Sequence, residues 1–141
     1  MTFNDYLKIF IDNDFPEFLQ KYLYTDTLRI LRGRSQFCGC DYTKVYSPRL
    51  FYTRFHHSII TALINYHFTQ DKKSTIASLL HDRNTPCFAH TIDYILGDYN
   101  IQESSESFHE DVLFQDYELL KMLKDDKIDV AEIIDLKSYP I

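Results

Sequence analysis

The sequence predicts an all-α fold, and three observations support this prediction. The 141 residues include only 3 Gly and 4 Pro, which suits a chain of helices better than a turn-rich β fold. Apolar residues recur at spacings of three and four in several segments, as they do on helices with one buried face. No convincing hairpin pattern is present, although residues 41–46 could form a short extended piece.

The first half of the chain is expected to form a short helix and a long one. Thr25 or Asp26 can cap the short helix, and Gly33 is expected to end it in a left-handed conformation. Ser47 and Pro48 form a cap with a proline at the first helical position, which opens a helix expected over 48–68. The short helix contains Leu28, Ile30 and Leu31, and the buried stripe of the long helix is expected to contain Phe51, Phe55, Ile59, Ala62, Leu63 and Tyr66.

The next two helices are expected on either side of the pair His81-Asp82. Asp71 or Ser74 starts the first of them, which runs into this pair with Ile76, Leu79 and Leu80 facing inward. Thr85-Pro86 repeats the cap-plus-proline signal and starts the second. That helix runs through Phe88, Ile92 and Ile95, and Gly97 is expected to end it.

Two more helices are expected toward the end of the chain. Ser107 and Glu110 have the spacing of a capping box at the start of the first. A last short helix is expected over 130–134, behind Asp129. The apolar residues of the first are Val112, Leu113, Tyr117, Leu119, Leu120 and Leu123, and the carboxylates Asp111, Asp116 and Glu118 are assigned to its solvated face.

Length and composition predict one domain over residues 1–141. No apolar run reaches the roughly 18 residues that span a bilayer, and the start lacks a signal-peptide pattern, so we expect a cytoplasmic protein without membrane contact. The odd set of 3 cysteines favours reduced thiols. Cys38 and Cys40 could hold a soft metal, but no second cysteine pair follows to complete a zinc site.

The net charge of −6 argues against general nucleic-acid binding, because clustered Lys and Arg hold phosphate backbones. A small anionic substrate would need local positive charge from a few arginines or from a bound metal. The excess of Tyr and Phe is assigned to the core or to a homo-oligomer interface. His56 and His67 are assigned structural roles.

The chemically informative residues lie in three short stretches, 54–58, 79–90 and 109–110, which hold five of the 6 histidines. Imidazole and carboxylate together form a ligand set suited to manganese, iron, cobalt, nickel or zinc. His81 and Asp82 end a predicted helix, so both can reach one ion if the backbone leaves helical geometry there. A third ligand must come from another helix, and His57 is the candidate.

These stretches resemble the HD-domain metal-dependent phosphohydrolases, in the branch of the deoxynucleoside triphosphate triphosphohydrolases. The resemblance covers roughly residues 28–114 and is specific in the motifs. It implies a helical bundle, a bound divalent metal ion (Mn, Fe, Co, Ni, Zn or Mg) and a small phosphorylated substrate of the nucleotide type. The residues that match the motifs are Arg54, His57, Ser58, His81, Asp82, Phe88, His90, Asp93, His109 and Glu110, with Arg32 and Gln36 at the spacing of an upstream pair and Pro86 shifted by one.

The resemblance also suggests roles for residues beside the metal ligands. His90 and Asp93 share one helix face, so Asp93 can orient His90 as a general acid toward the leaving oxygen. His109 is expected to act beside them in the catalytic site. Arg54 and Arg32 are expected to contact phosphate oxygens, and Gln36 is placed with them as a substrate-binding residue.

Two departures from the family pattern favour a rival hypothesis, a non-catalytic HD-scaffold module that binds a nucleotide or a protein partner. Asn84-Thr85 replaces the family's Gly-His, which puts triphosphate specificity in doubt. The fourth metal ligand, an aspartate followed by arginine in a later helix, has no clear match, and Asp129 and Asp135 lack its context. We therefore expect a chain that is incomplete at its C-terminus.

Overall fold

The computed structural model describes residues 15–37, 40, 43–45, 52–85, 95, 97 and 113–134. This part of the chain is helical, with one isolated bridge between Ser35 and Thr53 as its β pairing, so the all-α prediction is confirmed. Its elements are α2 (Glu17–Gln20), the 3₁₀ helix η1 (Lys21–Tyr24), α3 (Asp26–Leu31), α4 (Arg54–Thr69), α5 (Lys72–Leu80), α8 (Tyr117–Asp125) and α9 (Val130–Ile134). Within these ranges no helix is both long enough and apolar enough to cross a bilayer.

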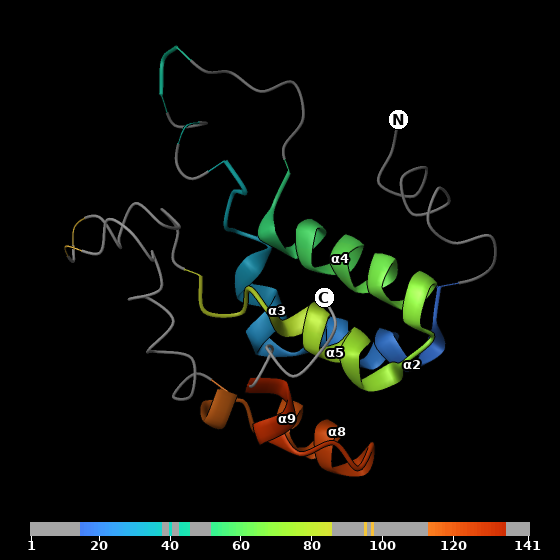
Figure 1. Cartoon of the computed structure of the whole chain (residues 1–141). Coiled ribbons are helices and arrows are strands. Elements are labelled where there is room, and N and C mark those ends of the chain that lie inside the picture. The colour runs from blue at the N-terminus through green and yellow to red at the C-terminus, as the bar shows by residue number, and fades with distance from the viewer. Residues whose placement is uncertain are drawn as a thin grey trace.

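Helix α5 lies at the centre of the arrangement. It packs against α4 along one side and against α9 on another, while α2 and α3 lie beside the α4–α5 pair (Figure 1). Every residue from Ser74 to Leu80 is buried, as expected of a helix enclosed on all sides. The first two turns of α5 place small residues, Ser74, Thr75 and Ala77, among its buried positions, which lets its neighbours approach closely.

The helices share one apolar core. The predicted inward residues of α4 and α5 belong to it, apart from Tyr66, which is half-buried and packs edge-on against Phe18 with ring centroids 5.3 Å apart. Phe51, predicted in the same stripe, lies outside the described residues. The buried members of this core are Leu19, Tyr22, Leu28, Leu31, Phe55, Ile59, Ala62, Leu63, Ile76, Ala77, Leu79, Leu80, Leu113, Leu119, Leu123, Ile128 and Ile133.

The long helix begins later than predicted, which corrects the expected range 48–68. Tyr52 and Thr53 are not helical, and α4 begins at Arg54. Thr53 caps it: its hydroxyl accepts from the His56 backbone N–H, while the Thr53 N–H donates to His56 Nδ1 at 3.3 Å. This capping box has His at the position where Glu or Gln is usual, so the sequence rule did not detect it. The structural role expected of His56 is confirmed.

The expected left-handed stop at Gly33 is also wrong. Helix α3 passes through a right-handed Arg32, and the Gly33 N–H donates to the Ile30 carbonyl in a turn. Gly33 has no positive φ, whereas Gly97, the other predicted stop, has a φ of 86°. Ile30 is half-exposed, so the buried face of α3 consists of Leu28 and Leu31 together with Thr27.

Asp116 breaks the helix that was expected to continue from Val112 to Leu123. Helix α8 begins at Tyr117, and Asp116 caps it by accepting from the Leu119 N–H at 3.0 Å. Its other oxygen accepts from the Thr27 N–H and hydroxyl at 2.9 and 2.6 Å. Asp116 is therefore buried and does not belong to a solvated face. Tyr117, expected among the apolar residues, is 82% exposed.

The start of α5 and the whole of α9 agree with the sequence, whereas α2 and η1 have no counterpart among the predicted helices. Asp71 caps α5 through a 2.8 Å bond from the Ser74 N–H, and α9 covers 130–134 as predicted. The predicted signals Ser47, Pro48, Ser107 and Glu110 lie outside the described residues, as does most of the helix expected before Gly97. Of the segment 41–46, residues 43–45 are described and form bends.

Candidate metal centre

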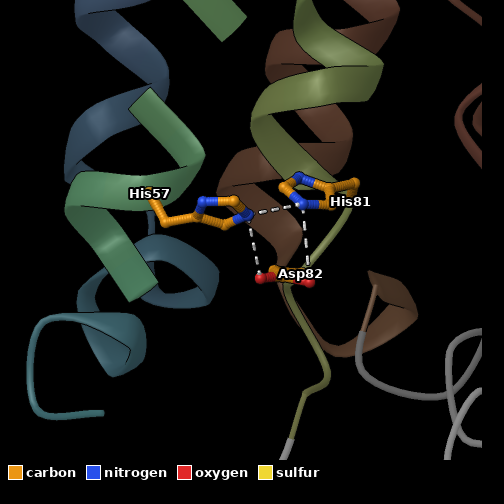
Figure 2. A group of neighbouring side chains, drawn as sticks. All are labelled: His57, His81 and Asp82. Carbon is orange, nitrogen blue, oxygen red and sulfur yellow. Dashed lines mark hydrogen bonds and ion pairs between the residues drawn. The ribbon is translucent and has the colours of Figure 1, made fainter. Parts of the chain in front are cut away.

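Three side chains from two helices converge on one point (Figure 2). His57 lies in the first turn of α4, His81 directly follows α5, and Asp82 comes next in the chain. The two Nε2 atoms are 3.2 Å apart, and they lie 3.6 and 3.5 Å from the nearest carboxylate oxygen of Asp82. The predicted convergence of these three residues is confirmed, and they could hold a metal ion.

The end of α5 explains how two adjacent residues reach the same point. On a continuing helix, neighbouring side chains diverge by about 100° around the axis. Here α5 ends at Leu80 and residues 81–84 form turns, closed by bonds from the Arg83 N–H to the Leu80 carbonyl and from the Thr85 N–H to the Asp82 carbonyl. The turn brings Asp82 back beside His81.

A backbone contact fixes the His81 ring in a form suited to metal binding. His81 Nδ1 lies 2.7 Å from the Ser78 carbonyl oxygen, an acceptor that requires the proton on Nδ1. In the neutral ring Nε2 then presents its lone pair toward His57 and Asp82. Such outer contacts commonly orient histidine ligands of metals.

The spacing of the three groups fits a first-row divalent ion. Metal–ligand bonds of about 2.1 Å place ligand atoms about 3.0 Å apart at right angles and about 3.4 Å apart in a tetrahedron. The observed separations of 3.2 to 3.6 Å need only small shifts to reach these values. Two imidazoles with one carboxylate favour such an ion over calcium or magnesium, which prefer oxygen ligands.

Burial and the neighbouring cationic groups favour the neutral form of the His57 ring. Burial lowers the pKa of His57, and the nearby His81 and Arg54 lower it further, while Asp82 acts in the opposite direction. A neutral imidazole is the form that binds metal. The three side chains are 32%, 24% and 18% exposed in chain order, so solvent can reach the centre.

Arg54 is buried against Asp82 and is not exposed to solvent beside the three ligands. Its Nη1 donates to Asp82 Oδ2 at 2.9 Å, and its side chain is only 5% exposed. The other oxygen, Oδ1, accepts from the Thr85 hydroxyl at 3.2 Å. The carboxylate is thus held between two donors.

The other predicted substrate contacts are Arg32 and Gln36, and Arg32 makes no hydrogen bond or ion pair with the three ligands. Arg32 is exposed and lies over the Phe55 ring, 4.2 Å from its centroid, with Nη2 near the Leu23 carbonyl. Gln36 is half-buried, and its backbone N–H donates to the Tyr52 carbonyl. Three predicted catalytic residues, His90, Asp93 and His109, lie outside the described residues.

Asp129 and Asp135 lie in the region of the sequence where the family has its fourth metal ligand. Asp129 is exposed and accepts from the Ala131 N–H at the start of α9, and it does not belong to the converging group. Asp135 lies outside the described residues. Within the described ranges the group therefore has three members. His67, expected to be structural, is exposed on α4 and contacts Phe68 edge-on.

Sequence reasoning missed two arginines that shape the turn after α5. Arg83 is buried and donates to the Leu80 carbonyl at 3.0 Å, and burial lowers its pKa to about 10. Arg34 donates to the Thr85 carbonyl at 2.6 Å. An arginine three residues beyond a helix end can cap its carbonyls, which is the signal that Arg83 offered.

Comparison with protein-family models, with curated proteins and with solved structures finds no match to this chain. The HD resemblance therefore remains a prediction from the motifs. The geometry of His57, His81 and Asp82 is independent of it, because these residues converge from helices whose boundaries follow from local caps and packing.

Proposed function

We propose that this protein is an HD-type metal-dependent phosphohydrolase that cleaves a phosphate ester or anhydride in a small, nucleotide-like molecule. The observation that supports the proposal most directly is the convergence of His57, His81 and Asp82 at ligand spacing. Three protein ligands leave coordination positions for water and substrate, as catalytic sites require. A divalent ion in such a site supplies an activated water molecule and a Lewis acid for the phosphoryl group.

The residues of the chain have distinct tasks in this proposal. His57 and His81 bind through Nε2, and Asp82 adds the negative charge that a divalent ion needs. His90, oriented by Asp93, gives a proton to the leaving oxygen, and His109 contacts phosphate oxygens. Partial exposure of the three ligands leaves the substrate a way in.

The alternative is a non-catalytic module that uses the same scaffold to bind a nucleotide or protein partner. One observation favours it: Arg54, expected at the phosphates, is buried against Asp82, which removes one of the predicted substrate contacts. Asn84 and Thr85 remove another, because the family has Gly-His there.

Metal analysis and a hydrolysis screen test the proposal. We expect the purified chain to bind about one equivalent of Mn²⁺, Co²⁺ or Zn²⁺ and to hydrolyse nucleotides or a generic p-nitrophenyl phosphodiester. His81→Ala should lose both properties, while His67→Ala, which changes an exposed histidine on α4, should keep both.

The outcomes separate the two candidate functions. Stoichiometric metal without hydrolysis of any of these substrates would favour the non-catalytic module. A chain that binds no divalent ion under conditions where it is folded would exclude the metal centre and with it the hydrolase.

A further inference from the structure

Arg54 is a buried cation with a specific partner. Its residue is 4% exposed, and among the described residues its guanidinium pairs with the carboxylate of Asp82. The Nε atom is buried without a hydrogen-bond partner, so burial of this side chain is costly. The Arg54 side chain is buried although its desolvation is unfavourable, which points to a function for the Arg54–Asp82 pair.

The position of Arg54 on α4 determines what it can reach. Arg54 and His57 are three residues apart, so they project from the same face of the helix. From this face both side chains reach Asp82, Arg54 Nη1 at 2.9 Å and His57 Nε2 at 3.6 Å from the same Oδ2 atom. Helix α4 therefore supplies His57, a candidate metal ligand, and Arg54, which holds the second candidate ligand Asp82 in place.

Asp82 is held from two sides. Arg54 donates to Oδ2 and the Thr85 hydroxyl donates to Oδ1, which fixes the plane of the carboxylate. Each oxygen also faces one imidazole, Oδ2 toward His57 and Oδ1 toward His81. Each oxygen has a second lone pair, so both donors can stay in place when a metal binds.

We propose that Arg54 is a positioning residue, which orients the Asp82 carboxylate for metal binding, and that it does not bind substrate. The inference rests on the proposed function only in that it requires a metal at this centre. Removal of an outer partner of a metal ligand commonly lowers affinity about 10- to 100-fold. We expect Arg54→Met to weaken binding of Mn²⁺ or Zn²⁺ within this range.

The test is calorimetric titration of the folded chain with the metal alone. Arg54→Met is compared with Arg54→Lys, which keeps the charge but offers one compact donor, and should recover part of the affinity. The matched control is Arg29→Met on α3, because Arg29 is exposed and pairs with exposed Asp26, and this variant should bind like the wild type. The Co²⁺ absorption spectrum adds a readout of coordination geometry, which should change in Arg54→Met and stay unchanged in Arg29→Met.

A second variant keeps the inference testable if Arg54→Met does not fold. Thr85→Val removes the other donor to Asp82 at a half-exposed turn position, and should lower metal affinity several-fold.

Three results have distinct meanings. A folded Arg54→Met, or in its place Thr85→Val, with wild-type metal affinity and spectrum overturns the inference and leaves the metal centre standing. A wild-type chain that binds no metal overturns both. Normal metal binding in wild type with the expected loss in Arg54→Met supports the inference even if no substrate is hydrolysed.

Discussion

The two ends of helix α5 differ in how their polar groups are matched. At the N-terminal end, each charged or amide group meets a complementary partner: Asp71 caps the helix, Asn65 Oδ1 accepts from the Ser74 hydroxyl at 2.7 Å, and Lys72 pairs with Asp126 at 3.0 Å. At the C-terminal end, two imidazole nitrogens and a carboxylate point at one another. The first end pairs donors with acceptors, whereas the second also brings three potential metal-ligand atoms to one point.

This difference separates a structural role from a binding role. Groups that are already matched gain nothing from a ligand, and their loss destabilises the fold. Three converging ligand atoms form a favourable arrangement once a cation binds between them. Substitutions at the two ends should therefore affect different quantities, folding stability at one and metal affinity at the other.

The largest effect is expected at the binding end. His57→Ala removes one of three ligands, and we expect metal affinity to fall more than about 100-fold, beyond the loss from an outer contact. The free energy of unfolding in chelator should change by less than about 1 kcal/mol, because the ring is one-third exposed. The measurement is thermal denaturation with and without Mn²⁺, since a bound ligand stabilises the folded state by an amount that grows with the logarithm of its affinity. Equal metal-induced shifts in wild type and variant would remove His57 from the centre.

The structural end should respond in the opposite way. Asn65→Ala removes the acceptor of the buried Ser74 hydroxyl, and we expect a loss of about 1–3 kcal/mol in unfolding free energy with unchanged metal affinity. Urea denaturation measures the loss, with His67→Ala as the exposed control on the same helix. If Asn65→Ala weakened metal binding at temperatures where it is folded, the two ends of α5 would not be independent.

The smallest effect is expected from Asp126 and depends on pH. Burial by itself would raise its pKa, but hydrogen bonds from Tyr22, Lys21 and Lys72 outweigh it and lower the pKa below the ordinary value of 3.8. A depressed pKa in the folded state adds stability above about pH 4, and this stability is lost as pH falls further. Because the lysines are 38% and 42% exposed, we expect about 1 kcal/mol.

The check is urea denaturation between pH 3 and 7 of wild type and Asp126→Asn. The variant should be less stable at pH 7 and should approach the wild type as the pH falls, because at low pH both carry an uncharged group. Parallel curves at all pH values would show that Asp126 contributes through its shape and not through its charge.

Part of the site was accessible from the sequence. His81 and Asp82 stand at the end of a strongly patterned helix, and His57 was the remaining candidate on a neighbouring long helix. The orientation of His81 by the Ser78 carbonyl follows from a spacing of three residues, which is local. The pairing of Arg54 with Asp82 joins residues that are 28 apart, so no local rule could give it.

The sequence by itself determined the elements whose caps and apolar faces are local. Asp71 and the residues that follow it dictate the start of α5, and the apolar pattern with Asp129 dictates α9 over 130–134. These depend on bonds between residues at most four apart, which tertiary contacts leave unchanged.

Tertiary structure decided the rest. Asp116 has a pattern that suits an exposed helical carboxylate, but the N–H and hydroxyl of Thr27, 89 residues away in sequence, hold it in the interior and end the preceding turn there. Arg54 has the sequence context of a substrate contact, but the packing of α4 against α5 buries it beside Asp82. In both cases a charged side chain takes its role from the partner that the fold brings to it, because a buried charge must be paired.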